Sequence, residues 1–346
     1  MRAWRVHEFG EPKDVLVLED VPEPTPADLE GMGMSMGGWV PAAEGKFPYD
    51  DWVLMDMTVA GLALPDVTMA RGTYPVPVPR PYTSGQEGVG TVTDAGSSYR
   101  HLLGKRVVAC CIQPWGSLAP VAIGVGTVFE VPEGMTDEEG AAFVIPAHTG
   151  WHVVHRRGQV QAGQTVAILG AAGGLGSAYV QLCVAAGARV IAIVGGPEKV
   201  AFCESLGAEG VDHTEGGVVD AVRAMTGGRG VDVIIDPVQG PEGAELRQVL
   251  VPDGRHVLCG HAGGLLPHDP HFYVANHTLV GATLGGYPTE RMQEIYAESQ
   301  AGLMDLIDRG LYRPLPTRAV AFEDVPDAVT DLVERRTMGR VVVEVT

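Results

Sequence analysis

A glycine-rich turn between an apolar run and a helical pattern constrains this chain more than any other stretch. Residues 165–169 are mostly apolar, the turn has the spacing Gly170-x-x-Gly173-x-x-Gly176, and a helical pattern covers residues 177–186. Glycine leaves room for a phosphate group to approach the backbone, and the N–H groups at the start of a helix attract negative charge. The spacing therefore predicts a strand, a tight turn and a helix that bind a dinucleotide.

The residues that follow complete a βαβ unit. Residues 189–194 have a strand pattern, and a second helix is predicted from Pro197 to Leu206, with proline in its first turn and Gly207 just after its end. This context favours a dinucleotide site over a glycine-rich turn in some other α/β protein, since a glycine pattern alone is a weak signal.

The end of the second strand bears on which nucleotide binds. An NAD site usually has a carboxylate there for the ribose 2′-hydroxyl, whereas a 2′-phosphate requires a cation and no acid. The strand ends in Val194-Gly195-Gly196 without a carboxylate, and Lys199 lies in the next helix. Lys199 is either a phosphate contact or an ordinary surface lysine, and the missing acid favours the contact. The sequence therefore favours NADPH.

The charge balance limits the partners of the chain. It has 346 residues, enough for two domains, with 24 basic and 43 acidic residues and a net charge of −19. So negative a surface repels nucleic acid and anionic membranes, and we expect neither as a partner. No apolar run has transmembrane length, no signal peptide is recognisable, and the five cysteines have no CxxC spacing. We expect a cytoplasmic protein with reduced thiols.

The pattern of predicted elements changes along the chain. Residues 1–135 contain short strand patterns separated by glycine and proline, which is typical of a β-rich domain. In residues 136–285 strands alternate with helices, and the six expected strands fit a doubly wound parallel sheet. Residues 286–346 are expected to rejoin the β-rich domain. The predicted strands are 2–6, 15–18, 52–59, 85–92, 105–109, 165–169, 189–194, one near Val211, 231–236, 255–259, 278–283 and 340–345, and the predicted helices are 61–71, 141–155, 177–186, 197–206, 244–250, 303–308 and 325–334.

The segment 27–51 has neither a helical nor a clean strand pattern. It is rich in glycine and methionine between Gly31 and Trp39. Two interpretations stay open: a flexible surface excursion, or a methionine-rich lid over an apolar substrate.

These pieces, in this order, resemble the medium-chain dehydrogenase/reductase superfamily over most of the chain except residues 27–51. Residues 170–176, 230–238, 260–264 and 339–342 resemble motifs of its zinc-independent NADPH:quinone oxidoreductase branch. The resemblance implies a GroES-like β-rich domain, residues 1–135 and 286–346, and a Rossmann domain, residues 136–285. It also implies a homodimer joined through the last Rossmann strand, residues 278–283.

The same resemblance bears on zinc. Two zinc-ligand positions of the related alcohol dehydrogenases fall on Ala63 and Gln86, and neither residue binds zinc well. His148, His152 and His155 have near-helical spacing without a carboxylate partner, so they are read as core or surface histidines in preference to a metal site. No metal is therefore expected.

Chemistry without a metal favours hydride transfer to a quinone or to a carbon–carbon double bond conjugated to a carbonyl or thioester. Tyr74 aligns with a tyrosine of the related enoyl thioester reductases and is either the proton donor or a tyrosine packed at a domain edge. Two other functions stay open: an alcohol dehydrogenase of the same superfamily, and a non-catalytic NADPH-binding protein with a structural or regulatory role.

The resemblance also implies which residues contact NADPH. Residues 173–175 would contact the pyrophosphate, Lys199 and His213 the 2′-phosphate, Thr149 the nicotinamide side, and residues 259–261 would offer backbone to the nicotinamide. The full set of predicted cofactor residues is Thr149, Gly170, Ala172, Gly173, Gly174, Leu175, Gly195, Lys199, His213, Cys259, Gly260 and His261.

Overall fold

The computed structural model describes residues 1–29, 32–35, 38–41, 50–75, 78–111, 113–268, 270–287 and 289–345. The chain divides into two compact units. Unit 1 contains residues 1–145, 285–296 and 314–346, and unit 2 contains residues 146–284 and 297–313. The predicted domains, residues 1–135 with 286–346 for one and residues 136–285 for the other, remain a prediction.

Unit 2 contains the predicted doubly wound sheet of parallel strands. Its strand order is β12-β11-β10-β13-β14-β15, so the chain reverses direction across the sheet between β10 and β13. Such a reversal opens a crevice at the carboxyl ends of the strands, where ligands of these folds bind. The strands are β10 (Thr165–Leu169), β11 (Arg189–Val194), β12 (Glu209–Asp212), β13 (Val231–Asp236), β14 (Leu250–Leu258) and β15 (Thr278–Gly281).

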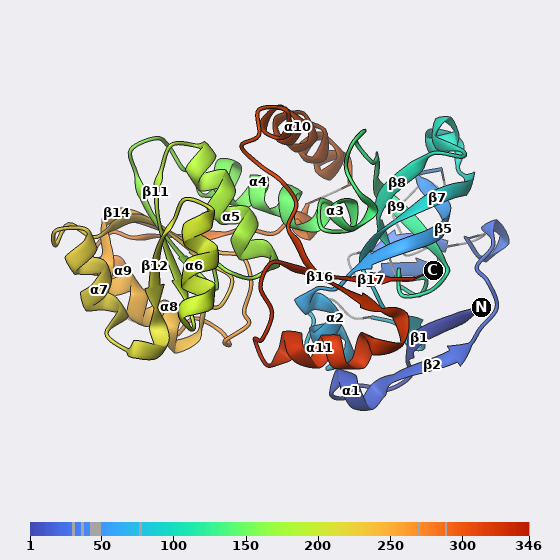
Figure 1. Cartoon of the computed structure of the whole chain (residues 1–346), viewed down its shortest axis with the longest axis horizontal. Coiled ribbons are helices and arrows are strands. Elements are labelled where there is room, and N and C mark those ends of the chain that lie inside the picture. The colour runs from blue at the N-terminus through green and yellow to red at the C-terminus, as the bar shows by residue number, and fades with distance from the viewer. Residues whose placement is uncertain are drawn as a thin grey trace. The chain divides into compact units, whose positions relative to one another are not determined.

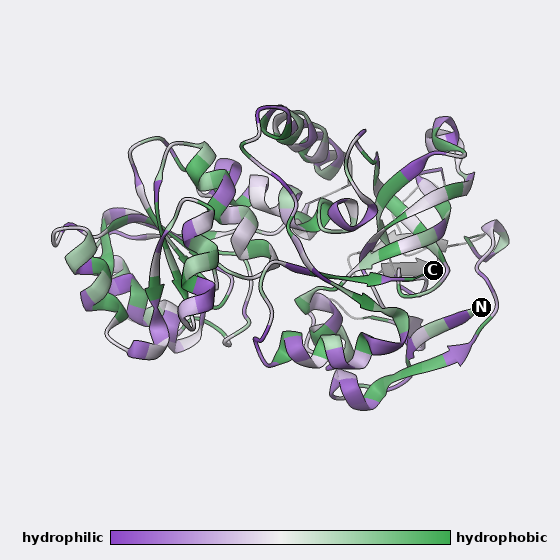
Figure 2. Ribbon diagram, viewed as in Figure 1, coloured by the Kyte–Doolittle hydropathy of each residue, from purple (hydrophilic) through white to green (hydrophobic). Residues whose placement is uncertain are grey.

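The central strands of this sheet are apolar because helices cover both faces, as expected for a parallel sheet. All five residues of β10 are buried, and Val166 pairs with Val190 of β11 on one side and with Val233 of β13 on the other. Figure 2 shows these strands mainly in the hydrophobic colour, whereas the helices around them carry both colours. The helices between the strands are α5 (Gly174–Ala185), α6 (Pro197–Ser205), α7 (Val218–Met225), α8 (Gly240–Leu246) and α9 (His271–Val274).

Unit 1 is built on a mainly antiparallel sheet. The strand order is β16-β17-β5-β7-β8-β9, and β5 also pairs with β9, which closes part of the sheet on itself (Figure 1). A smaller sheet has the order β2-β1-β6. The strands are β1 (Arg2–Val6), β2 (Leu16–Asp20), β5 (Trp52–Gly61), β6 (Tyr82–Thr83), β7 (Glu87–Ala95), β8 (Arg106–Cys111), β9 (Val121–Glu130), β16 (Pro316–Ala321) and β17 (Arg340–Glu344). The helices are α1 (Pro12–Val15), α2 (Leu64–Ala70), α3 (Asp137–Ala141) and α11 (Val325–Val333).

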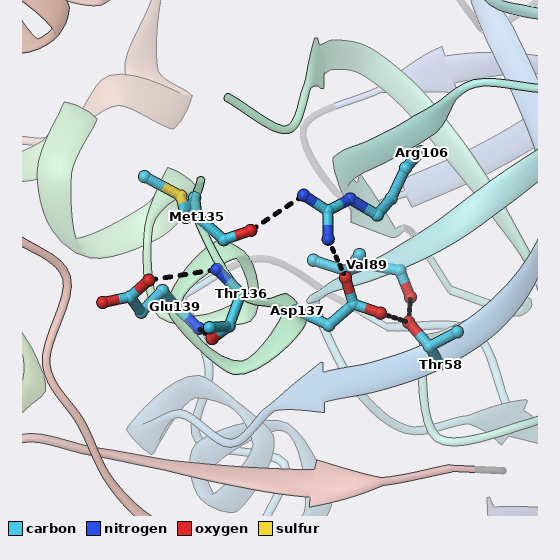
Figure 3. A network of polar contacts seen from close by, with 7 residues as sticks. All are labelled: Thr58, Val89, Arg106, Met135, Thr136, Asp137 and Glu139. Carbon is cyan, nitrogen blue, oxygen red and sulfur yellow. Dashed lines mark hydrogen bonds and ion pairs between the residues drawn. The ribbon is translucent and has the colours of Figure 1, made fainter. Parts of the chain in front are cut away.

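A polar network fastens α3 to the sheet of unit 1 (Figure 3). Asp137 of α3 accepts hydrogen bonds from the Thr58 hydroxyl at 2.7 Å and from Arg106 Nη1 at 2.9 Å. Thr136 and Glu139 form a capping box at the helix N-terminus, which satisfies backbone N–H groups that a helix leaves unpaired. The start of the helical stretch is therefore fixed to β5 and β8.

Several predicted elements differ from the observed ones. The helix predicted at 244–250 ends at Leu246, because a 3₁₀ turn (Arg247–Val249) follows and Leu250 begins β14. The helix predicted at 303–308 is the end of the longer α10 (Thr289–Asp308). Strands β6, β9 and β16 and helices α1, α7 and α9 were not predicted.

The segment 27–51 is described only in part. Two short strands, β3 (Met32–Ser35) and β4 (Gly38–Pro41), pair antiparallel where no strand was predicted. The alternatives of a surface excursion and a methionine-rich lid stay predictions, because residues 30, 31, 36, 37 and 42–49 lie outside the described part of the chain. No helix among the described residues is long and apolar enough to cross a membrane.

Candidate functional site

The turn between β10 and α5 has the backbone that the glycine spacing predicted. Gly170 has a φ of +59°, which favours glycine. A Cβ on Gly176 would lie 2.2 Å from Gly170 O, so this glycine lets the helix pack directly on the turn. A Cβ on Gly173, in contrast, would have only Gly170 O near it, at 3.5 Å. The protein leaves the space over Gly173 open, which suits the close approach of a ligand.

Exposure separates the ligand-facing part of this turn from its packed part. Ala172 and Gly176 are buried, whereas Gly173, Gly174 and Leu175 are half-buried. Gly173 is the N-cap residue of α5, so the first N–H groups of the helix have no partner within the helix. The turn is therefore a backbone-lined cradle with positive potential, and it fits a pyrophosphate.

The end of β11 brings two of the predicted cofactor residues, Gly195 and His213, together. The Cβ that Gly195 lacks would lie 2.9 Å from His213 Nε2, so the imidazole packs against the bare backbone at Gly195. His213 is exposed and begins a 3₁₀ turn directly after β12. Lys199 lies half-buried in the first turn of α6.

A carboxylate that sequence reasoning missed fixes the start of α6. Asp212 of β12 pairs in register with Val194, and its Oδ1 accepts hydrogen bonds from Gly196 N at 2.9 Å and from the N–H and hydroxyl of Thr214 at 2.9 and 2.7 Å. These bonds lower the pKa of Asp212. The tip of β11 has no acid of its own, as predicted, but the neighbouring strand supplies one. Its position at the end of the short strand predicted near Val211 was the available signal.

The predicted nicotinamide residues lie in the loop after β14. Cys259, Gly260 and His261 are half-buried, and Cys259 N donates to Asp236 O at 3.1 Å. A Cβ on Gly260 would lie 2.6 Å from Pro237 O, so this loop lies directly on the turn after β13. The carboxyl ends of β13 and β14 therefore present one continuous surface of backbone.

Thr149 lies in the helical stretch that leads to β10. It is half-buried and begins α4 (Thr149–Trp151), which lies between two π-helical turns, Val144–His148 and His152–Arg157. Such widened turns are frequent at functional sites. The structure thus gives Thr149 an irregular, partly accessible position in unit 2.

Unit 1 carries the predicted proton donor. Tyr74 follows α2, is half-buried, and hydrogen-bonds to the side chain of Gln86. Burial raises its pKa above the ordinary value. The Gln86 amide also donates to Met69 Sδ at 3.5 Å. Tyr74 is therefore a neutral hydroxyl held beside an amide.

Two buried carboxylates, Asp66 and Glu87, and the buried Arg340 form an interacting group in the same unit, and sequence reasoning missed them as a group. Arg340 Nη2 donates to Glu87 Oε1, and Ile145 N donates to Glu87 Oε2 at 2.7 Å. Asp66 accepts from the backbone N–H of Ala63 at 2.8 Å. Burial raises the pKa of Glu87 to about 7 and that of Asp66 to about 6. Asp66 lies inside a mainly apolar run and Arg340 directly precedes one, whereas Glu87 lies between Gln86 and Gly88 and gave no such signal.

The donor atoms at the two implied ligand positions do not fit zinc. Ala63 has no ligand atom, and the Gln86 amide is engaged with Tyr74 and Met69. Among the described residues no three His, Cys, Asp or Glu side chains lie together as a ligand set. His148 and His152 are buried in unit 2, with His148 Nδ1 at 2.6 Å from Ser299 Oγ, and the His155 ring lies 4.3 Å from that of Trp151.

Comparison with known proteins adds a family to this geometry. A family model described as an alcohol dehydrogenase GroES-like domain matches residues 49–121, and one described as a zinc-binding dehydrogenase matches residues 174–300. Quinone oxidoreductase-like protein 2 of Rattus norvegicus is 29% identical over 295 residues, which cover 84% of this chain and 83% of that protein. Quinone oxidoreductase of Homo sapiens is 25% identical over 337 residues, 96% of this chain and 94% of that protein.

Solved structures agree with these relatives. The quinone oxidoreductase of Thermus thermophilus, whose structure was also solved in complex with NADPH, is 28% identical to this chain. It superposes with a TM-score of 0.79 over 99% of this chain and 100% of that one. Both family models, the relatives and the shared fold lead to one assignment. This chain belongs to the medium-chain dehydrogenase/reductase superfamily, in its quinone oxidoreductase branch.

Proposed function

We propose that this chain is an NADPH-dependent, zinc-independent oxidoreductase that reduces a quinone or an alkene conjugated to a carbonyl or thioester. The observation that carries the proposal is the open cradle over Gly173, Gly174 and Leu175 at the start of α5. The complex of the Thermus relative with NADPH supports the choice of cofactor. When bound, the cofactor supplies a hydride from its nicotinamide ring.

The cofactor residues would act in three groups along the carboxyl edge of the parallel sheet. The turn from Gly170 to Leu175, with Ala172 packed beneath it, donates backbone N–H groups to the pyrophosphate. Gly195 lets the His213 imidazole lie against the end of β11, and Lys199 and His213 bind the 2′-phosphate of the adenosine ribose. Thr149 and the backbone of residues 259–261 orient the nicotinamide.

Tyr74 would supply the proton. Hydride addition to a conjugated alkene leaves a carbanion equivalent that must be protonated at the α-carbon or at the enolate oxygen. Tyr74 suits this role because burial keeps its hydroxyl protonated, and Gln86 holds the ring in place. A quinone takes up the same hydride and one proton, which water can deliver to an oxygen atom.

The test is a panel of quinones, enones and enoyl thioesters, with NADPH oxidation as the readout. Lys199→Ala should raise the KM for NADPH while that for NADH changes little, because only NADPH carries the 2′-phosphate. Equal effects on both would remove the phosphate role of Lys199. A purified protein that oxidises NADPH with no member of the panel, or that contains one zinc per chain, would contradict the proposal.

Tyr74→Phe separates the two substrate classes. It removes one hydroxyl and keeps the ring, so alkene reduction should slow more than quinone reduction. Equal slowing would return Tyr74 to a packing role. If tight NADPH binding were found without turnover, and Tyr74→Phe changed nothing, a non-catalytic protein would be the better description.

We also propose a homodimer formed through β15. This strand is at one end of the sheet, and Leu279 on it is 39% exposed, while Tyr273 and Val274 of the preceding α9 are more exposed still. An apolar edge strand is a surface for pairing with another chain. Light scattering should find two chains per particle, and Leu279→Lys should give one.

All five cysteines are free, which supports a cytoplasmic location.

A further inference from the structure

Gln239, in the turn after β13, has a backbone conformation that side chains rarely adopt. Its φ is +58° and its ψ is −139°. This region belongs almost entirely to glycine, and another residue keeps it only where the surroundings hold it there. The next residue, Gly240, also has a positive φ, +63°, but there a Cβ would lie 2.4 Å from Gly263 O, so glycine is required at 240 and glutamine is kept at 239.

The backbone of Gln239 is held from both sides. Its N–H donates to Asp236 Oδ1 at 2.5 Å, and the same oxygen accepts from Val238 N at 2.9 Å. The Gln239 carbonyl accepts from Gly243 N at 3.1 Å, within α8. Asp236 is itself fixed, because its Oδ2 lies 2.8 Å from His256 Nε2 and both side chains are completely buried.

The side chain of Gln239 connects this turn to the loop after β14. Its Nε2 donates to Gly260 O, at the start of that loop, and its Oε1 accepts from Leu266 N at 3.0 Å, near the other end. A single amide therefore binds both ends of the loop 260–266. Only a side chain that carries both a donor and an acceptor at this reach can make the two bonds.

Other bonds hold the middle of the loop without Gln239. Gly263 N donates to Val238 O at 2.8 Å, and Ala262 N donates to Pro237 O at 3.2 Å. These bonds join backbone groups only, so a substitution at residue 239 leaves them in place. The side chain is thus needed for the position of the loop ends, and the fold of the loop has other support.

We propose that Gln239 is a positioning residue that holds the backbone of Gly260 and its neighbours where the nicotinamide would contact it. The inference rests on the proposed function, because the role of the loop depends on NADPH binding at this edge of the sheet. The unfavourable backbone at residue 239 is kept because the amide makes both connections. A glycine there would relieve the backbone and release the loop.

The experiment compares Gln239→Gly with Gln159→Gly. Gln159 is also a glutamine with a positive φ, +48°, in unit 2, but it is exposed and only its backbone carbonyl is used, by Arg255 at 3.4 Å. Both substitutions relieve the backbone, and in Gln239→Gly this relief offsets the loss of the two side-chain hydrogen bonds, so neither should lower the melting temperature. Only Gln239→Gly should raise the Kd for NADPH, by about tenfold, since two hydrogen bonds that order the site are lost.

Hydrogen exchange of the protein without cofactor gives a readout that does not depend on NADPH. The Leu266 amide should exchange faster in Gln239→Gly and remain protected in Gln159→Gly. Gln239→Glu keeps the acceptor for Leu266 N and loses the donor to Gly260 O. It should therefore protect the Leu266 amide and still bind NADPH more weakly.

The outcomes distinguish this inference from the proposed function. If the unmodified protein binds no NADPH, the proposed function fails. If it binds NADPH, and Gln239→Gly binds equally well with an unchanged Leu266 amide, the positioning role is wrong. If Gln239→Gly binds NADPH more weakly but also has a lower melting temperature than the unmodified protein, while Gln159→Gly does not, Gln239 would be a structural residue.

Discussion

In unit 1 burial raises the pKa of two carboxylates, whereas in unit 2 burial lowers the pKa of two imidazoles, and the two shifts make stability respond to pH in opposite directions. Burial raises the pKa of Glu87 to about 7 and that of Asp66 to about 6. Burial lowers the pKa of His148 to about 3 and that of His152 to about 4. In each case the low-dielectric interior opposes the charged form.

The signs follow from proton linkage. Between about pH 4 and pH 7 the native carboxylates of unit 1 bind more protons than the unfolded chain does, so their contribution to stability is lost as the pH rises. Between about pH 6.5 and pH 3 the unfolded chain binds more protons at the two histidines, so their contribution is lost as the pH falls. Mild acid should therefore favour unit 1 relative to unit 2.

The difference also concerns partners. Glu87 has Arg340 beside it, so charge can be kept in the interior of unit 1. His148 has the hydroxyl of Ser299, a neutral partner. Where a buried charge has a charged partner, the stability of the region depends on that partner. Where a buried imidazole is neutral, the stability depends on the pH at which it would take up a proton.

The largest expected effect is that of Arg340→Met. It leaves Glu87 without its cation, and breaking a buried pair typically costs about 3–5 kcal/mol of unfolding free energy. The loss should be smaller at pH 5 than at pH 8, because Glu87 can then take up a proton. Urea denaturation followed by circular dichroism measures both values. Arg318→Met, at an exposed pair with Asp331 in the same unit, is the control and should cost far less.

Glu87→Gln should remove part of the pH dependence of unit 1. One group that binds a proton only in the native state contributes at most about 1.4 kcal/mol per pH unit. Hydrogen exchange of peptides from β5 and β7 should show protection that falls from pH 5 to pH 8 in the unmodified protein, after correction for the intrinsic exchange rate. A variant with the same slope would mean that Glu87 does not set it.

His148→Gln should change the opposite slope, in unit 2. With its pKa lowered to about 3, the native His148 stays neutral, and linkage gives a loss of about 2 kcal/mol between pH 8 and pH 5. The variant should lose less stability over that range, as measured by exchange in peptides from β10 and β13. His7→Gln, at an exposed histidine of unit 1, is the matched control and should leave the slope of unit 2 unchanged.

The smallest expected effect is that of Glu209→Gln, on the surface of unit 2. Arg189 and Glu209 form a salt bridge at 2.6 Å, but their side chains are 40% and 47% exposed. Water and salt screen such pairs, so the loss should stay below about 1 kcal/mol and vanish in about 1 M salt. A loss as large as that of Arg340→Met would show that burial does not govern these interactions.

The elements that the sequence predicted well are those with strong local patterns. Strands β10, β13 and β17 were all placed within one residue, and α5 begins three residues before its predicted start, because glycine spacing and apolar period are read from neighbours in the chain. Strand β9 was missed since Gly124 and Gly126 interrupt its pattern, and it is stabilised by pairing with both β5 and β8. The first half of α10 was missed because it is rich in polar residues.

The candidate site likewise has one part that local sequence predicted and one part that depends on a neighbouring strand. The cradle of Gly170, Gly173 and Gly176 was predicted from spacing, whereas Asp212 came from a neighbouring strand and was not expected.

The sequence by itself determined where a phosphate can approach the backbone, because a turn without side chains depends only on residues next to each other. The tertiary structure alone decided that Arg340 meets Glu87, 253 positions away, and that Gln239 reaches both Gly260 and Leu266. These contacts depend on which strands lie side by side, and strand order is fixed by packing of the whole sheet, which no local pattern records.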